Sequence, residues 1–107
     1  MVNPSRPVTA LYTEALELAN VTLKAKGVKS AVQIMKEFFD TNQEPMAAHF
    51  TSKSVKQVEQ EMQGHMLEAS TMFASIMKSN PEKAQAFFSE LQDMVDEEFQ
   101  AFKEYAS

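Results

Sequence analysis

Two histidines and the carboxylates around them are the residues of this chain best suited to acid–base or metal chemistry. His65 has Glu61 four residues before it and Glu68 three residues after it, a spacing that makes them neighbours on a helix. A carboxylate-bridged metal centre in a helical bundle needs a Glu-x-x-His pair on each of two helices and further inward-facing glutamates. Here only His65 is expected to face inward, because His49 falls in a segment expected to connect helices. The pattern predicts a hydrogen-bonded bundle histidine and no metal site.

The segment DTNQE at residues 40–44 resembles the start of a calcium loop, because oxygen-bearing side chains stand at alternating positions. A calcium loop continues with a glycine for its sharp turn and has a glutamate at its twelfth position. This sequence has Pro45 and Thr51 at those two positions. The segment is therefore interpreted as the end of a helix running into a polar loop.

Nucleophilic catalysis finds no support in the sequence either. A catalytic serine or threonine needs a nearby base and an oxyanion hole, and the chain has no glycine-rich elbow or phosphate loop that could supply one. The absence of cysteine excludes thiol catalysis, thiolate zinc sites, iron–sulfur clusters and disulfides. We therefore expect a protein that is not an enzyme and has no cofactor.

The composition determines which elements are available to position these residues. The chain has 107 residues, 44% of them hydrophobic, which is enough for the core of one domain. Two glycines and four prolines are too few for a protein of many short strands. The net charge of −5 argues against nucleic acid as the main partner. No apolar run is long enough for a membrane span, and residues 1–7 are too polar for a signal peptide. These features predict a cytoplasmic all-α domain.

Hydrophobic periodicity predicts one domain of about four amphipathic helices after a flexible segment at 1–7, in which Ser5 could cap the first helix. Two shorter helices are expected within 8–42, then a linker at 43–51, then a helical hairpin at 52–106. The first helix is expected to bury one face, formed by Val8, Leu11, Tyr12, Ala15, Leu18 and Ala19.

The strongest local signal is the sequence SNPE at 79–82. Asn80 is a good helix cap, Pro81 has the φ angle required at the first helical position, and Glu82 suits the positive end of the helix dipole. A new helix is therefore expected to begin at Pro81. The short connection makes the last two helices an antiparallel hairpin.

Methionine and phenylalanine are concentrated on the two helices of this hairpin, and methionine side chains suit adaptable binding surfaces. Helices within 8–42 are shorter than hairpin arms of roughly 38 Å, so part of the hairpin is expected to remain uncovered. The sequence thus predicts at least a dimer or a protein partner. The expected interaction surface comprises Met62, Met66, Phe73, Met77, Phe87, Phe88, Met94, Phe99 and Phe102.

Glu98 is a charged residue in the middle of an apolar stripe that includes Leu91 and Phe102. A buried carboxylate needs a partner or an exposed seam between helices. If the hairpin turns near Asn80, His65 lies within about one helical turn of Glu98. Two alternatives remain open. In the first, Glu98 either pairs with His65 or lies in a seam that faces a partner. In the second, its side chain extends to water at the end of the stripe.

The segment IMKSNPEKA at 76–84, with the aromatic-rich helix that follows it to Tyr105, resembles phasins, helical proteins that coat polyester storage granules. The resemblance implies an amphipathic protein on an apolar granule surface. From the residues themselves, the leading hypothesis is a non-enzymatic protein–protein interaction module, an adaptor, inhibitor or assembly factor. Granule coating is the alternative.

Overall fold

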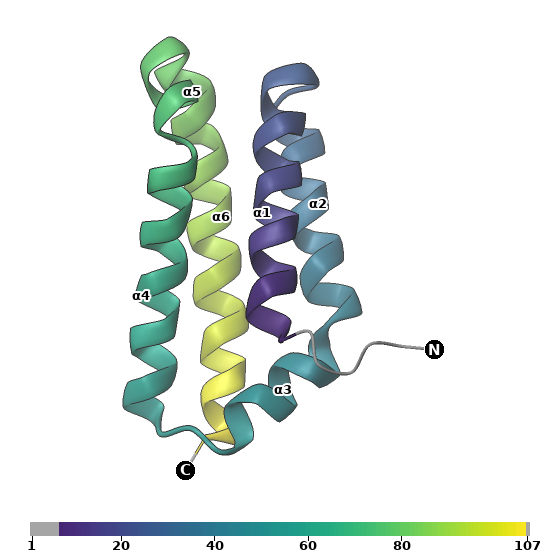
Figure 1. Cartoon of the computed structure of the whole chain (residues 1–107), viewed down its shortest axis with the longest axis vertical. Helices are drawn as coiled ribbons and strands as arrows, with labels where there is room; N and C mark the ends of the chain where they lie inside the picture. The colour runs from purple at the N-terminus through teal and green to yellow at the C-terminus, as the bar shows by residue number, and fades with distance from the viewer. Residues whose placement is uncertain (1–6, 107) are drawn as a thin grey trace.

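The protein is an all-α bundle of two helical hairpins (Figure 1). The structure, a computed structural model, describes residues 7–106, and this part of the chain contains no strand. The expectations of a flexible segment at 1–7 and of a cap at Ser5 fall on residues outside this part, except Pro7. Pro7 occupies the N-cap position of the first helix and makes no side-chain capping hydrogen bond there. The all-α class is confirmed. The helices are α1 (Val8–Ala25), α2 (Val28–Thr41), α3 (Gln43–Thr51), α4 (Val55–Met72), α5 (Ala74–Ser79) and α6 (Pro81–Phe102), followed by the 3₁₀ turn η1 (Lys103–Tyr105).

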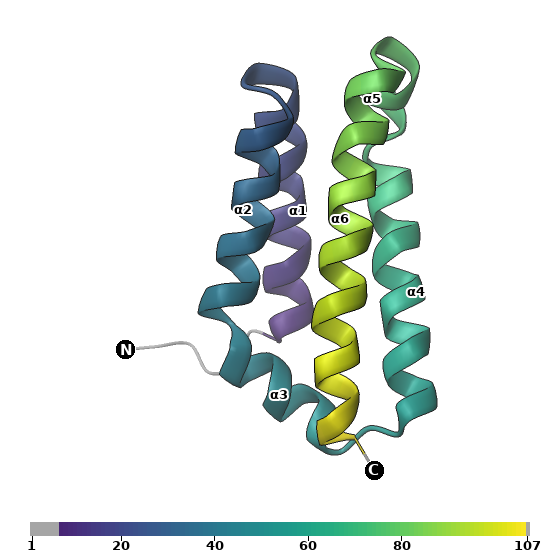
Figure 2. The same ribbon diagram turned by 180° about the vertical axis from the view of Figure 1, so that it is seen from behind.

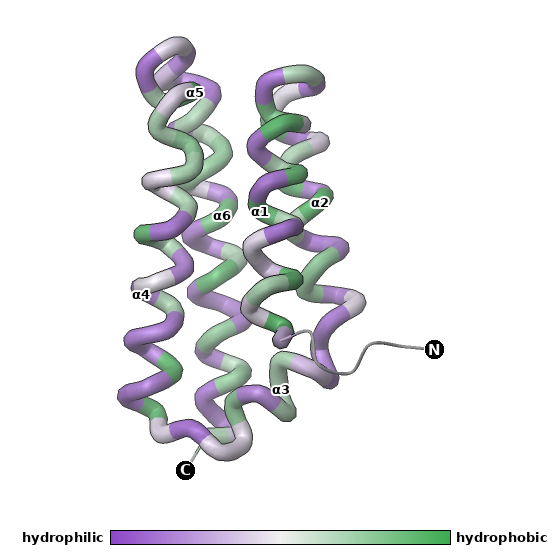
Figure 3. The backbone as a smooth tube through the Cα atoms, viewed as in Figure 1, coloured by the Kyte–Doolittle hydropathy of each residue, from purple (hydrophilic) through white to green (hydrophobic). Residues whose placement is uncertain are grey.

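The first hairpin pairs α1 with α2 through a turn at Gly27. Gly27 has a φ of 109°, a backbone conformation that favours glycine over residues with a side chain. In both views α1 and α2 stand side by side, and α2 also packs against α6 (Figures 1 and 2). Each helix alternates hydrophilic and hydrophobic stretches, as amphipathic helices do (Figure 3). The buried side chains of α1 are Val8, Tyr12, Leu16, Ala19 and Leu23.

This set corrects the expected inner face of α1. Leu18 is 56% exposed, whereas Leu16 and Leu23 are fully buried. Leu11 and Ala15 are only partly buried. The expectation failed because α1 contains apolar residues around most of its circumference, so periodicity did not define a single stripe.

The second hairpin packs α4 and α5 against α6. Ser54 and Gln57 form a capping box at the start of α4: the Gln57 backbone N–H donates to Ser54 Oγ at 3.2 Å, and the Ser54 N–H donates to Gln57 Oε1 at 2.8 Å. As expected, α6 begins at Pro81, and the side chain of Asn80 accepts a hydrogen bond from the Lys83 N–H.

The first arm of this hairpin differs from the expected continuous helix. It is divided at Phe73, which stands between α4 and α5. The ring of Phe73 is fully buried and stacks on Phe87 of α6, with centroids 4.9 Å apart and planes inclined by 9°. The count of about four helices becomes six in the described part of the chain, because this arm is divided and the connection between the hairpins is also helical.

That connection, expected as the linker 43–51, is the helix α3. Pro45 lies in its first turn, where the missing N–H of proline costs no helical hydrogen bond. Met46 and Phe50 are one turn apart and both buried. Phe50 packs its ring against Phe99 and Phe102 at the end of α6. Thus α3 covers the end of the hairpin that the shorter helices α1 and α2 were expected to leave open.

Candidate functional site

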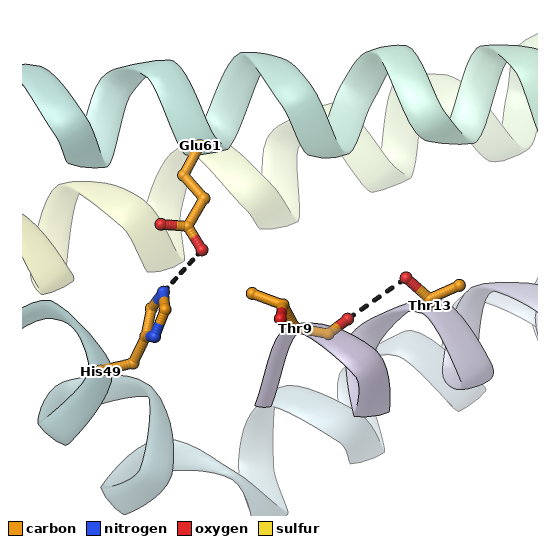
Figure 4. Close-up of polar contacts among 4 residues, drawn as sticks. All are labelled: Thr9, Thr13, His49 and Glu61. Carbon is orange, nitrogen blue, oxygen red and sulfur yellow. Dashed lines mark hydrogen bonds and ion pairs between the residues drawn. The ribbon is translucent and has the colours of Figure 1, made fainter. Parts of the chain in front are cut away.

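The polar side chains that reach the interior gather where α1, α3 and α4 meet. We call this group the polar layer: Tyr12, Thr13, His49, Glu61, His65 and Glu68. His49 Nε2 lies 2.6 Å from Glu61 Oε1, joining α3 to α4 (Figure 4). Both side chains are slightly more than one-fifth exposed. The pair is an ion pair when His49 carries a proton on both ring nitrogens and a hydrogen bond otherwise.

A second polar connection joins α1 to α4. The hydroxyl of Thr13 is 2.9 Å from Glu68 Oε2 and 3.2 Å from the carbonyl oxygen of Thr9 in its own helix. Figure 4 shows the local bond to Thr9. Since a hydroxyl donates only one hydrogen, it bonds either the carboxylate or the carbonyl at any moment. Further along the same interface, the Asn20 side-chain amide donates to the backbone carbonyl of Met72 at 3.4 Å.

His65 lies at the centre of the polar layer, in an aromatic environment. It is 7% exposed, with ring centroids 4.0 Å from Tyr12 and 5.6 Å from Phe99. Burial lowers the pKa of His65 below its usual value, although the nearby carboxylates of Glu61 and Glu68 oppose this effect. The inward position was predicted correctly. The prediction of a hydrogen bond to its side chain was wrong, because no described residue forms one with the His65 imidazole. Its side-chain contacts are with the aromatic rings of Tyr12 and Phe99.

Burial also raises the pKa of the Tyr12 phenol, and the carboxylate of Glu68 adds to the increase. The Tyr12 hydroxyl is buried without a hydrogen-bond partner among the described residues. Within residues 7–106, no three histidine or acidic side chains are grouped so that they could hold a metal ion. What the polar layer does in this structure is to connect the first hairpin and α3 to α4.

Glu98 does not pair with His65. Its Oε1 accepts a hydrogen bond of 2.7 Å from the side-chain amide of Gln43, at the start of α3. The helical projection placed Glu98 on the inner stripe, but the side chain lies on the side of α6 that faces α3 and is only partly buried. The other alternative, a solvated carboxylate at the edge of the stripe, is closer to the structure.

The expected Met/Phe interaction surface is only partly accessible. Phe73, Phe87, Phe99 and Phe102 are at most 1% exposed and belong to the core, which corrects their assignment to a surface. They are buried because the two arms of the hairpin, and α3 at its end, cover them from within the chain. Five members of the set are partly buried at the margin of the core: Met62, Met66, Met77, Phe88 and Met94.

The most exposed large apolar side chains are elsewhere, on the outer faces of α1 and α4. Leu18 and Val21 of α1 are 56% and 63% exposed, and Leu67 of α4 is 68% exposed. Leu67 lines a shallow groove on α4 together with Gly64, Glu68, Thr71 and Met72. The sequence did contain a signal for this site, because Leu67 and Gly64 both lie off the inward face of α4, where Val58, His65 and Ala69 are buried.

Comparison of the chain with protein-family models, with curated proteins and with solved structures finds no significant match. No described helix is both long enough and apolar enough to cross a membrane. The residues of the chain alone therefore carry the functional inference.

Proposed function

We propose that this chain is a non-enzymatic helical interaction module that binds another protein through the outer surface of α4. We call this surface the α4 face: Gly64, Leu67, Thr71 and Met72, the uncharged lining of the groove on that helix. Residues 64, 67 and 71 follow a spacing of three and four, so they form one strip along the helix. The proposed partner segment is an amphipathic helix, whose apolar side would cover Leu67.

The observation that carries this proposal is the combination of Gly64 with Leu67. A β-carbon added at Gly64 would meet no atom within 4 Å, so packing inside the chain does not require glycine there. Its φ is in the ordinary range, since Gly27 is the one described glycine with positive φ. Glycine inside a helix nevertheless costs about 1 kcal/mol relative to alanine. Because Gly64 has no side chain, the surface beside Leu67, the most exposed described leucine, stays open. The backbone of an incoming helix can approach α4 closely at this point, and this access would offset the cost of the glycine.

The surroundings of the α4 face support a mostly apolar partner. Glu68 is the one charged side chain that lines the groove, and its carboxylate is within hydrogen-bond distance of Thr13. Met72 is partly buried and has an unbranched, polarizable side chain that adapts to different partner shapes. Covering a leucine side chain fully is worth about 1.5–3 kcal/mol, enough to make Leu67 a principal contact.

The first test separates binding from folding. Gly64→Ala should stabilise the isolated protein by about 0.5–1 kcal/mol in a urea titration, because it removes the helix penalty. The same variant should bind the partner more weakly, because the new methyl group fills the open surface beside Leu67. A variant that is more stable but binds less well has no explanation in folding alone. Unchanged or stronger partner binding by Gly64→Ala would contradict the proposal.

Identification of the partner uses a photo-crosslinking amino acid at position 67, expressed in the native cell, with the same amino acid at Gln100 as the matched control. Gln100 is exposed on α6 and does not line the groove of the α4 face. A defined protein adduct is expected at position 67 and not at position 100. The granule-coating alternative gives a different result: the purified protein would bind polyester beads or lipid droplets and gain helix on them. That outcome, without a protein adduct, would replace the proposal.

A further inference from the structure

We propose that a second copy of this chain docks on the outer groove between α1 and α2, forming a two-fold symmetric dimer. This surface is distinct from the α4 face, and the inference does not depend on the proposed protein partner. The groove runs along the first hairpin, from the turn between its helices to the end of α2. Leu18 of α1 and Ile34 of α2 line both halves of the groove and so mark its middle.

The two halves of this groove carry opposite charges. Lys26 and Lys29 line the half next to the turn. Glu37 lines the other half, together with the partly buried apolar side chains of Leu11 and Ala15. The groove is therefore basic next to the turn, apolar around Leu18 and Ile34, and acidic beyond them at Glu37. A surface of this kind is complementary to itself after a half-turn, because rotation places the basic end of one copy on the acidic end of the other.

The register of the proposed contact follows from α2. Lys29, Gln33 and Glu37 are spaced four residues apart on α2 and are all exposed. Glu37 lines this groove, whereas Lys29 and Gln33 line both it and the neighbouring groove between α2 and α6. The two charged residues lie about 6 Å along the helix on either side of Gln33. A two-fold axis at Gln33 brings two copies of α2 together in antiparallel orientation, with Lys29 of each copy opposite Glu37 of the other. Within the described part of the chain, the Glu37 carboxylate accepts a single long hydrogen bond, of 3.4 Å from the Gln33 amide, while its backbone carbonyl accepts from the Thr41 hydroxyl.

The apolar middle of the groove supplies the part of the interface that excludes water. Leu18 is 56% exposed in the single chain, and Ile34 beside it is partly buried. The axis at Gln33 places the two Leu18–Ile34 regions next to each other, so each leucine loses water on docking. A face one hairpin wide and 18 residues long measures roughly 20 by 27 Å. This is smaller than the ~800 Å² per partner of a standard interface, so the dimer is expected to dissociate at micromolar concentration.

The test is a charge exchange between two variants, followed by sedimentation equilibrium from about 1 µM to about 500 µM. The unmodified chain should dimerise within this range. Lys29→Glu and Glu37→Lys should each raise the dissociation constant about tenfold or more, because each variant places like charges opposite one another twice. A one-to-one mixture of the two variants should recover dimers of the original strength. In the mixed dimer, the unchanged Lys29 of the Glu37→Lys chain faces the unchanged Glu37 of the Lys29→Glu chain. The two substituted positions also face each other and carry opposite charges.

Lys56→Glu is the matched control, because it reverses an exposed lysine on α4, outside the groove. It should leave the dissociation constant unchanged. Circular dichroism melts of all three variants establish that they fold, which is expected because the altered side chains are exposed. A chain that stays monomeric throughout the range overturns the proposal. The proposal is also overturned if neither charge variant weakens the dimer or if the mixture of the two variants does not restore it. Dissociation of the dimer by Leu67→Ser would overturn it as well, because that result would place the interface on the α4 face.

Discussion

The imidazole of His65 lies against the phenol ring of Tyr12, with centroids 4.0 Å apart and planes inclined by 35°. The first residue is on α4 and the second on α1, so this ring contact joins the two hairpins inside the bundle. Burial acts on both groups in the direction that favours the neutral form: it lowers the pKa of His65 and raises that of Tyr12. Protonation of His65 would place a positive charge in this buried contact between rings, which is why burial favours the neutral imidazole.

The first prediction is that acidification weakens the fold through His65. The pKa of His65 is lower in the folded protein than in the unfolded chain, where it is about 6.5. Below that value the unfolded chain binds a proton that the folded protein resists, so stability falls as pH decreases from 7 through 6.5 toward the folded pKa. The charged and titratable groups facing His65 are Glu61 and Glu68 on α4, His49 on α3 and Tyr12 on α1.

Thermal melts at about pH 7 and about pH 5.5 measure this effect, with His65→Gln as the comparison. Glutamine does not titrate, so the decrease in melting temperature should be larger in the unmodified protein than in the variant. Groups that do not interact with His65 contribute equally to both proteins and cancel in this difference. Equal pH dependence in the two proteins would show that His65 does not hold a neutral, buried state.

The second prediction concerns the hydroxyl of Tyr12, which is buried without a hydrogen-bond partner among the described residues. An unpaired buried hydroxyl costs about 1–3 kcal/mol. Tyr12→Phe removes the oxygen and keeps the ring that packs on His65 and Phe38. Urea denaturation should show an unchanged or higher free energy of unfolding, by up to about 2 kcal/mol. A loss of more than about 1 kcal/mol would mean that the hydroxyl is bonded in solution.

The parts of the fold that could be predicted from sequence are those set by neighbouring residues. Asn80 and Pro81 determine the start of α6 through local geometry, and the structure begins the helix there. His65 was correctly placed inside because it lies on a regular apolar heptad of α4. In both cases the deciding interaction lies within a few residues along the chain.

The parts that could not be predicted depend on distant contacts. Residues 43–51 read as a linker because Pro45 and only two large apolar residues gave little helical signal, and the packing of Phe50 on α6 stabilises that helix. Glu98 was projected toward His65 because no sequence rule shows that Gln43 would lie beside it. The α4 face was missed as a site because single exposed leucines are ordinary on protein surfaces.

The third prediction tests whether α3 is an integral part of the core. Phe50 is fully buried and contacts Phe99 and Phe102 of α6. Phe50→Ala should lower the free energy of unfolding by about 3–5 kcal/mol, through lost burial and the cavity left behind. Tyr105→Ala is the control, because Tyr105 is 54% exposed and its loss should cost less than about 0.5 kcal/mol. Similar costs for the two variants would mean that α3 is not held against the hairpin.

The fourth prediction separates the two possible partners of Glu98 by double-mutant cycles. Glu98 Oε1 accepts a 2.7 Å hydrogen bond from Gln43, in an exposed setting that screens the carboxylate. Gln43→Ala and Glu98→Ala should therefore couple by about 0.5 kcal/mol in urea titrations at neutral pH. His65→Gln and Glu98→Ala should instead be additive, because the charges acting on His65 come from Glu61, Glu68 and His49. Coupling above about 1 kcal/mol between His65 and Glu98, with none between Gln43 and Glu98, would place the carboxylate inside the hairpin and contradict the observed position of α3.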